Sequence, residues 1–446
     1  MRRTRGVWQG MIPLDLKNRR VTVAGLGKFG GGIGVARWLV GRGARVLVTD
    51  KAPAEKLLES IHKLDGLPIE FVLGEHRAVD FTDTDLVVTS LAVPPSSEFL
   101  SMAQSKSVPI TTEIALFVER CKSRIVGVTG TKGKSTTSKL IELMIATKHV
   151  VHLGGNIGGS LLDELSAIRE NDVVVLELSS FMLYWLGKNR WSPNAAVLTM
   201  IGQDHLDWHE TLEAYRDAKA QIVLHQQPNC LAFAHAGHPV SVEIARRTPA
   251  EFRLVSDDPS NRLDLKIAGV HNQHNGQLAV ACAMSFGVDR DSAMKSVRDF
   301  AGLPHRLQLV HESNGVRFID DSIATVPESA IAACLAFERG SVIQIVGGSD
   351  KGNDVTSMAR VLAERCRAVL GIGFLGQSIV DEVRKVSGFE GCCAEYVETL
   401  ENAIARARTT SREGDVVLLS TGCASYDQFT NFEARGNRFA ELARVS

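Results

Sequence analysis

The sequence contains 446 residues, of which 44% are hydrophobic and 23% are charged, and its formal net charge is -1. That length suits about three domains, and the composition is that of a soluble globular protein. A net charge near zero gives no general attraction to nucleic acid or membranes, so neither partner is expected. No apolar run approaches the roughly 18 residues of a membrane span, and no apolar segment follows the basic start of the chain, so we expect a cytoplasmic protein.

The eight cysteines are scattered along the chain, apart from the adjacent pair Cys392-Cys393. Adjacent cysteines lack the CxxC spacing of a metal site, and the remaining cysteines suggest no disulfide framework. We therefore expect free or buried thiols, as in a reducing cytoplasm.

Short β-branched runs alternate with helical stretches, which is typical of α/β domains with largely parallel sheets. The first part predicts strands at Val21–Ala24, Arg45–Thr49 and Asp85–Thr89 and a helix at Val35–Arg42. The second part predicts strands at Arg124–Val128, Val173–Leu176 and Ala195–Leu198 and helices at Leu212–Leu224, Gln277–Met284 and Asp291–Phe300. The third part predicts strands at Val316–Ile319, Val342–Val346, Ala368–Gly371 and Val416–Leu419. The simplest division is into three domains, residues 1–113, 114–302 and 303–446.

The strongest chemical signal is a glycine-rich loop between a buried strand and a helix. The strand ends at Thr129, and a helix is expected to begin at about Lys134. This arrangement directs backbone N–H groups and the positive end of the helix toward an anion. We expect Lys134 to contact the outer phosphates of ATP and Ser135 to bind Mg²⁺ through its hydroxyl. The residues expected to bind the phosphates are Gly130, Thr131, Lys132, Gly133, Lys134, Ser135 and Thr136.

This loop is a shorter variant of the general phosphate-binding pattern, because Val128 stands where that pattern has its first glycine. Downstream, Glu177 ends a predicted strand, where open α/β sheets present ligand groups. A carboxylate there is suited to holding a Mg²⁺ ion that bridges nucleotide phosphates. The alternative is a strand end capped by local hydrogen bonds.

The first domain carries a second glycine-rich turn, Gly25-Leu26-Gly27-Lys28-Phe29-Gly30, and Asp50 follows one strand later. This pattern fits a dinucleotide fingerprint, although GxGxxG alone is a weak signal. A glycine turn and a helix N-terminus hold any pyrophosphate, so the same residues suit a nucleoside diphosphate substrate. An NAD-dependent oxidoreductase is the alternative, but it gives no role to the phosphate loop.

Further motifs follow in order along the chain. They are Thr129–Thr137, Gly155-Asn156-Ile157-Gly158, Glu177-Leu178-Ser179-Ser180-Phe181, Asp204-His205-Leu206-Asp207, Lys219, His271-Asn272 with Asn275, Gly302–Arg306, Asp320-Asp321-Ser322, Cys423–Phe429, Asn431-Phe432 and Arg435-Gly436. This ordered series resembles the Mur ligase family. The segment from Cys423 onward discriminates best, and it is similar to the members that add glutamate to UDP-N-acetylmuramoyl-L-alanine.

The resemblance implies a Rossmann-like N-terminal domain for the UDP of the substrate, a central phosphate-loop ATPase-type domain, and a C-terminal Rossmann-like domain for glutamate. It implies an ATP-dependent amide ligase of cytoplasmic peptidoglycan synthesis that works through an acyl phosphate with two Mg²⁺ ions. The substrates would be ATP, UDP-N-acetylmuramoyl-L-alanine and D-glutamate. We expect a monomer.

The resemblance also implies roles for side chains that look ordinary in the sequence. His205 would bind a second Mg²⁺, and Lys219 would be carbamylated by CO₂, which turns a cation into an oxygen ligand for a hard metal. With Lys134 and Glu177, these would be the catalytic residues. Nucleotide binding is implied for Asn272, Asn275, Arg306 and Asp321. Substrate binding is implied for Gly27, Asp50, Asn156, Ser179, Thr325, Lys351, Ser425 and Phe432.

The chain departs from the family pattern near substrate recognition. Ile323 and Val326 stand where the family has lysine and asparagine. Met182 and Lys132 stand where the glutamate-adding members commonly have glutamine and asparagine. L-Glutamate therefore stays open as the amino acid, and a nucleotide-binding relative without catalysis stays open as the function.

Two further departures lie in the first domain. Ser90-Leu91-Ala92 replaces a Ser-Pro-Gly loop, and Gly30-Gly31-Gly32 is expected to lengthen the first glycine-rich turn. At the other end of the chain, the segment from Ser425 to Phe432 argues against folylpolyglutamate synthase, which has a similar phosphate loop.

Overall fold

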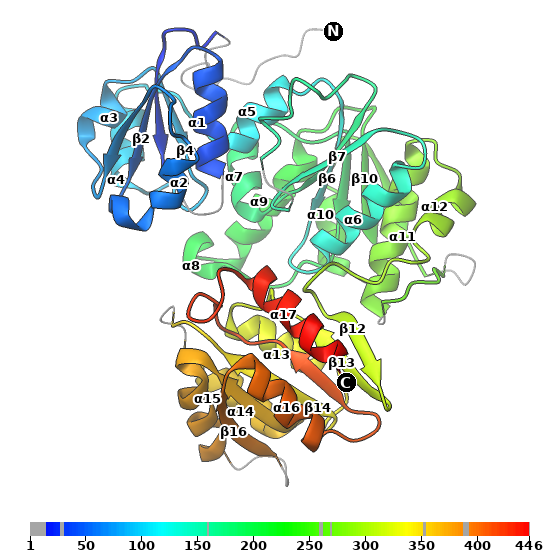
Figure 1. Cartoon of the computed structure of the whole chain (residues 1–446). Helices are drawn as coiled ribbons and strands as arrows, with labels where there is room; N and C mark the ends of the chain where they lie inside the picture. The colour runs from blue at the N-terminus through cyan, green and yellow to red at the C-terminus, as the bar shows by residue number, and fades with distance from the viewer. Residues whose placement is uncertain are drawn as a thin grey trace. The chain divides into compact units, whose positions relative to one another are not determined.

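The computed structural model describes residues 15–26, 31–157, 160–257, 262–267, 270–350, 354–386 and 392–445. The chain separates into two compact units, Met1–Asp299 and Phe300–Ser446. The first unit contains two sheets and the second contains one (Figure 1). The predicted α/β class is confirmed, whereas the domain boundaries at residues 113 and 302 stay predictions. Within the described residues, no helix has the length and apolar character needed to cross a membrane.

The first sheet is formed before residue 113. Its elements are β1 (Arg20–Ala24), α1 (Gly31–Gly41), β2 (Arg45–Asp50), η1 (Ala54–Lys56), α2 (Leu58–His62), β3 (Ile69–Leu73), α3 (Ala78–Thr82), β4 (Leu86–Thr89), α4 (Glu98–Ser105) and β5 (Ile110–Thr111). The strands are parallel in the order β3-β2-β1-β4-β5, so the chain winds outward from the centre in both directions. Nucleotide-binding α/β domains share this doubly wound order.

The second sheet follows α5 (Glu113–Arg120). Its strands are β6 (Arg124–Thr129), β7 (Val151–Gly155), β8 (Val173–Glu177), β9 (Ala195–Leu198), β10 (Leu231–His235) and β11 (Glu251–Val255). Its helices are α6 (Lys134–Ile145), α7 (Ser180–Lys188), α8 (Leu206–His209), α9 (Leu212–Leu224), α10 (Pro239–Ala245), α11 (Val270–Ser285) and α12 (Arg290–Ser296). All strands are parallel, in the order β11-β10-β9-β6-β8-β7.

Continuous apolar runs explain why β6 and β8 lie inside this sheet, away from its edges. Both strands are almost continuously buried, as expected for parallel strands that are covered on both faces. One face packs against α7 and α9 through Leu183 and Ile222. The other face is covered by α6 and α11, which pack against each other. This packing fixes the carboxyl ends of the two strands, where the phosphate loop and Glu177 lie.

The second unit contains one mixed sheet. Its elements are β12 (Gln308–Ser313), β13 (Val316–Asp320), α13 (Pro327–Leu335), β14 (Val342–Gly347), α14 (Thr356–Arg365), β15 (Cys366–Ile372), α15 (Gly373–Lys385), β16 (Cys393–Glu398), α16 (Leu400–Thr410), β17 (Val416–Leu419) and α17 (Phe432–Arg444). The order is β12-β13-β17-β14-β15-β16, and the edge strand β12 runs antiparallel to β13. Helices α13 to α15 cover one face, and α16 and α17 cover the other.

Most interior strands match the predictions, but the buried strand β10 and several edge strands were missed. The half-buried strands β3, β7, β11, β12 and β16 have no strong apolar run, because one or both of their faces are open to solvent. The prediction that three glycines lengthen the first turn was wrong for Gly31 and Gly32, which belong to α1. A Cβ on Gly32 would lie 2.4 Å from the Leu26 carbonyl oxygen, so the close approach of α1 requires glycine there. Gly30 lies outside the described residues.

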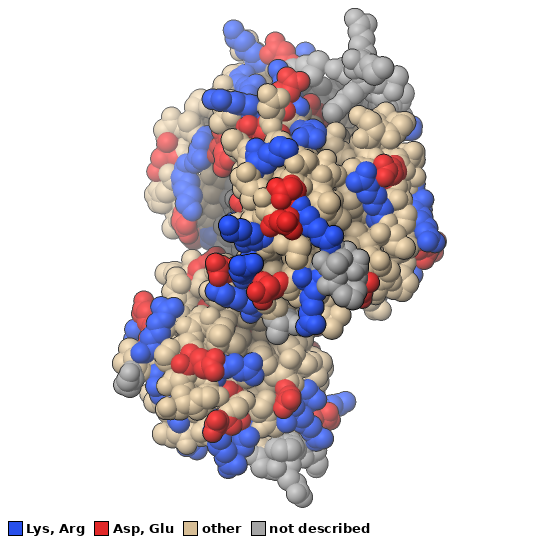
Figure 2. Space-filling view, turned by 90° about the vertical axis from the view of Figure 1, so that its right-hand side faces the viewer, with Lys and Arg blue, Asp and Glu red and all other residues tan. Residues whose placement is uncertain are grey.

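Charged side chains are mixed over the molecular surface. On the face shown in Figure 2, lysine and arginine are interspersed with aspartate and glutamate among uncharged residues. This distribution agrees with the formal net charge of -1.

Candidate active site

The predicted phosphate loop connects β6 to α6, and two of its glycines are required by close contacts. A Cβ on Gly130 would lie 1.9 Å from Thr199 Oγ1. Gly133 has φ +87°, and a Cβ there would lie 2.5 Å from Asn275 Oδ1. Helix α6 then begins at Lys134, as predicted. The loop therefore lies tightly between the end of β9 and α11, with the N-terminus of α6 open to an anion.

Lys134 folds back over this loop. Its Nζ donates hydrogen bonds to the carbonyl oxygens of Gly130 at 3.1 Å and Thr131 at 3.2 Å. Ser135 is buried beside it, Thr136 is half-buried, and Lys132 is exposed. The ammonium group thus lies where the sequence predicts the phosphates of a nucleotide.

Glu177 lies next to the loop because β8 pairs directly with β6, with Glu177 opposite Val128. Its side chain is only 2% exposed. Oε1 accepts a hydrogen bond of 3.0 Å from Asn156 Nδ2, whereas Oε2 is buried and has no hydrogen-bond partner among the described residues. A buried carboxylate oxygen without a donor is costly unless a cation compensates it, so the position suits a metal ligand.

Lys219 reaches the same loop from α9. It is 2% exposed, and its Nζ donates to the Gly130 carbonyl oxygen at 2.8 Å. Burial, reinforced by the positive charge of Lys134, lowers the pKa of Lys219 well below its ordinary value, although Asp204 and Glu177 oppose the shift. The lowered pKa increases the fraction of neutral amine, which is the nucleophilic form.

His205 follows β9 in a loop, as predicted, and has the unusual φ of +51°. Its side chain is partly exposed, and its Nε2 lies 3.7 Å from Asp204 Oδ2. The ring also lies 4.8 Å from the ring of Phe181, which comes from α7. These contacts hold the imidazole at the border of the site rather than inside the core.

Asn275 lies in α11 against Gly133 and is 4% exposed. Asn272 lies three residues earlier in the same helix, so both side chains are near the same face. Ser179 caps α7 by accepting a hydrogen bond from the Met182 N–H at 3.2 Å. Asn156 is exposed after β7, and its side chain contacts Glu177.

Asp50 lies at the carboxyl end of β2 in the first sheet. Its Oδ2 accepts a hydrogen bond from the Leu26 N–H at 2.9 Å, and its Oδ1 accepts one from the Ala52 N–H at 2.8 Å. The carboxylate therefore holds the turn after β1. Gly27, the neighbouring predicted residue, lies outside the described residues.

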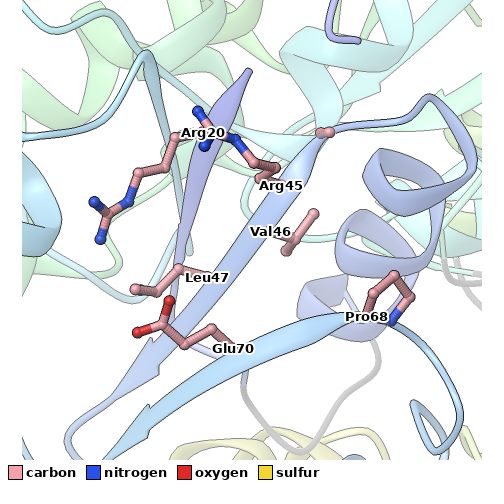
Figure 3. A pocket seen from close by; sticks show the side chains of 7 residues that line it. Arg20, Arg45, Val46, Leu47, Pro68 and Glu70 are labelled. Atoms are coloured by element: carbon pink, nitrogen blue, oxygen red, sulfur yellow. The ribbon is translucent and has the colours of Figure 1, made fainter. Parts of the chain in front are cut away.

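A pocket of about 430 Å³ lies elsewhere in the first sheet (Figure 3). Arg20 and Arg45 line it, and they are the first residues of β1 and β2. The pocket therefore lies toward the amino ends of the strands, whereas ligands of such sheets bind at the carboxyl ends. It does not belong to the candidate site.

In the second unit, Asp321 follows β13 and is 5% exposed. Its carboxylate accepts hydrogen bonds from Ser420 Oγ at 2.7 Å and from the Leu307 N–H at 3.1 Å. Burial raises its pKa to about 6, although these hydrogen bonds and the charge of Arg306 act in the opposite direction. Arg306 is exposed.

The loop after β17 contains Ser425, which is 3% exposed. Phe432 begins α17, and its carbonyl oxygen accepts a hydrogen bond of 2.8 Å from Ser322 Oγ. Thr325 is half-buried in the loop before α13. These residues lie near the carboxyl ends of strands in the same sheet. Lys351 lies outside the described residues.

Known proteins match nearly the whole chain. Residues 128–287 match the Mur ligase middle domain, and residues 305–423 match the Mur ligase, glutamate ligase domain. A UDP-N-acetylmuramoylalanine–D-glutamate ligase of Roseiflexus sp. (strain RS-1) is 39% identical over 96% of this chain and 99% of the relative. The chain belongs to the Mur ligase family. A ligase of the same name from Symbiobacterium thermophilum is 34% identical over 96% of this chain and 98% of its own length.

Solved structures share the fold of this Mur ligase. A UDP-N-acetylmuramate–alanine ligase from Thermotoga maritima has a TM-score of 0.56 at 23% identity, covering 95% of this chain and 99% of its own. A MurF ligase from the same organism, solved with ADP, has a TM-score of 0.55 at 18% identity, covering 97% of this chain and 98% of its own.

One residue that the motifs did not single out joins the site of this Mur ligase. Tyr215 of α9 places its hydroxyl 2.8 Å from Thr131 Oγ1 in the phosphate loop. Its only sequence signal is the spacing of four residues before Lys219, which puts both side chains on the same helix face. The structure thus brings the loop, Glu177, Lys219 and Asn275 together in the first unit.

Proposed function

We propose that this Mur ligase joins D-glutamate to UDP-N-acetylmuramoyl-L-alanine and converts ATP to ADP and phosphate. The full-length similarity to ligases of that name supports the substrates. The main structural support for the reaction is that Lys134 of α6, Glu177 of β8 and Lys219 of α9 all lie at one phosphate loop.

Amide formation needs a better leaving group than hydroxide. A carboxylate oxygen of the UDP substrate attacks the γ-phosphorus of ATP, which releases ADP and forms an acyl phosphate. The amine of glutamate then attacks the carbonyl carbon, loses a proton, and expels phosphate together with the former carboxylate oxygen. The loop N–H groups and Lys134 position the phosphates and neutralise their charge, which is the main form of catalysis in phosphoryl transfer.

The donor set at the loop fits Mg²⁺. Ser135 and Glu177 would hold one ion, and the unpartnered Glu177 Oε2 is a ligand atom available for it. His205 and a carbamylated Lys219 would hold a second ion, and the lowered pKa of Lys219 favours the neutral amine that reacts with CO₂. Bound Mg²⁺ supplies positive charge to the phosphate oxygens.

Recognition of the other substrates is assigned to the loops at the strand ends. Gly27, Asp50, Asn156 and Ser179 would bind the UDP substrate in the first unit. Thr325, Lys351, Ser425 and Phe432 would bind glutamate in the second unit, where Lys351 offers a charge for a carboxylate. Asn272, Asn275, Arg306 and Asp321 would contact the nucleotide. The enzyme would act as a monomer in the cytoplasm.

The test is a ligase assay with the purified chain, ATP, Mg²⁺ and UDP-N-acetylmuramoyl-L-alanine, with D- and L-glutamate in parallel. We expect ADP release together with a product heavier by one glutamate residue, with D-glutamate only. Product with L-glutamate alone would reverse the assignment of the amino acid. ATP binding without turnover in any combination would instead identify a nucleotide-binding relative that lacks catalysis.

A further inference from the structure

Tyr215 is one of the most deeply buried large side chains in the first unit, with 1% of its surface exposed. It lies one helical turn before Lys219 on α9. Its ring lies under the amine of that lysine, with the ring centroid 4.8 Å from Nζ. Its hydroxyl lies 2.8 Å from Thr131 Oγ1. One face of α9 therefore contacts the phosphate loop through two consecutive turns.

Thr131 receives contacts from both sides of the loop. Its N–H donates to the Met200 carbonyl oxygen at 2.7 Å, and its Oγ1 accepts from the Gly202 N–H at 2.9 Å. The bond to Tyr215 is the second hydrogen bond of the same hydroxyl, and either oxygen can be its donor. The preceding residue, Gly130, is bound through its carbonyl oxygen by Lys219 at 2.8 Å.

These contacts make the hydroxyl of Tyr215 the link between α9 and the side chain of Thr131. Without that link, Thr131 keeps its contacts to the segment after β9, but α9 is then held to this region by the bonds from Lys219 to the Gly130 carbonyl oxygen at 2.8 Å and to Thr129 Oγ1 at 3.5 Å, neither of which reaches the Thr131 side chain. Backbone N–H groups of the loop bind phosphate well only when they are held in place beforehand. The phenol is itself too deep to reach a nucleotide.

We propose that Tyr215 is a positioning residue for ATP, and that its hydroxyl fixes the phosphate loop through Thr131. The proposal rests on the proposed function only in taking ATP as the nucleotide. Tyr215 needs no contact with ATP, with the UDP substrate or with glutamate. Loss of its hydroxyl should therefore weaken the binding of ATP and leave the binding of the other two substrates unchanged.

The test is Tyr215→Phe, which removes the hydroxyl and keeps the ring beneath Lys219. ATP affinity is measured directly by titration calorimetry, and kcat and KM are measured for each of the three substrates. We expect ATP to bind about three- to tenfold more weakly, the range for loss of one hydrogen bond. The KM values for glutamate and for the UDP substrate should stay within about twofold of the parent, the size of a change below roughly 0.5 kcal/mol.

The matched control is Tyr184→Phe. Tyr184 lies on α7 in the neighbouring aromatic group, 5.3 Å from the ring of Trp208, and its side chain makes no hydrogen bond to the loop within the part of the chain that the structure describes. This variant should bind ATP like the parent chain. Unchanged ATP binding in Tyr215→Phe, or an equal loss in both variants, would overturn the proposal.

If Tyr215→Phe folds poorly, Thr131→Val alone removes the same hydrogen bond and should weaken ATP binding by a similar factor, and unchanged ATP binding would overturn the proposal. Thr131→Val removes the other partner, and the double variant completes a cycle. If the hydroxyl acts through Thr131, Tyr215→Phe costs little further ATP affinity in the Thr131→Val background. If the two single variants lose ATP affinity in full and additive amounts, the hydroxyl of Tyr215 does not act through Thr131. Because ATP binding is read directly, absence of ligase turnover in the parent chain would count against the proposed function and leave this test intact.

Discussion

The proposed ATP site of the first unit and the proposed glutamate region of the second unit are built differently. In the first unit, Glu177 and Lys219 are each 2% exposed, and they contact the loop or its neighbours directly. In the second unit, the described residues assigned to glutamate are uncharged: Ser425 is buried, whereas Thr325 and Phe432 are half-buried. Buried charges at the phosphate loop indicate a preorganised reaction centre, whereas the partly exposed loops of the second unit indicate a region where recognition can vary.

The largest effect is expected from Lys134→Ala. Its ammonium group lies over the loop, so its loss should lower kcat by about 10³-fold, the upper range for one preorganised electrostatic contact. Steady-state ADP release measures this. Lys139→Ala on the same helix, which removes only the ion pair with Glu142, is the control and should change kcat little.

Lys219→Ala tests whether the buried amine becomes an oxygen ligand. Activity should fall by about 10² to 10³-fold. Acetate should restore part of it, because a small carboxylate fits the space and supplies the missing oxygen atoms, whereas chloride at equal ionic strength should not. Full activity of Lys219→Ala without acetate would show that a carbamate on Lys219 is not needed for catalysis.

The two units differ in how far the sequence predicted them. The phosphate loop and Glu177 follow strands with strong apolar runs, so their positions could be predicted from the pattern. The helix α9 was predicted in the same way, but the role of Lys219 on it came only from the family resemblance. The unpartnered Oε2 of Glu177 and the bond from Tyr215 to Thr131 could not be predicted, because they depend on contacts between elements distant in sequence. Edge strands were missed because their exposed faces remove the apolar signal.

In the second unit, the carboxyl group of Asp321 is expected to make the stability of the fold depend on pH. Its pKa of about 6 in the folded chain lies above the ordinary value of 3.8, so folding favours the protonated form. The contribution of Asp321 to stability is therefore full below about pH 4 and is lost as the pH rises through about 6, an effect of about 3 kcal/mol. Urea unfolding of the parent chain and of Asp321→Asn at pH 4 and pH 7 measures it.

The asparagine variant should lack this pH dependence. The unfolding free energy of the parent chain should therefore fall relative to that of Asp321→Asn as the pH rises. A constant difference between the two would show that burial of Asp321 does not control its ionisation.

The smallest effect is expected from Ser425→Ala in the loop after β17. If this loop binds glutamate, loss of the hydroxyl should raise the KM for glutamate roughly three- to tenfold, as for one hydrogen bond, and leave ATP binding unchanged. Substrate saturation curves for both ligands separate these effects. A raised KM for ATP with an unchanged KM for glutamate would show that this loop of the second unit contributes to ATP binding and not to glutamate binding.

In the proposed reaction, the first unit activates a carboxylate by phosphoryl transfer. The direct measurement uses UDP-N-acetylmuramoyl-L-alanine labelled with ¹⁸O in its carboxylate, with ATP and D-glutamate, followed by mass spectrometry of the products. An acyl phosphate predicts that one labelled oxygen leaves with inorganic phosphate and the other stays in the amide. Product formation with unlabelled phosphate, or with the label in AMP, would show that no acyl phosphate forms.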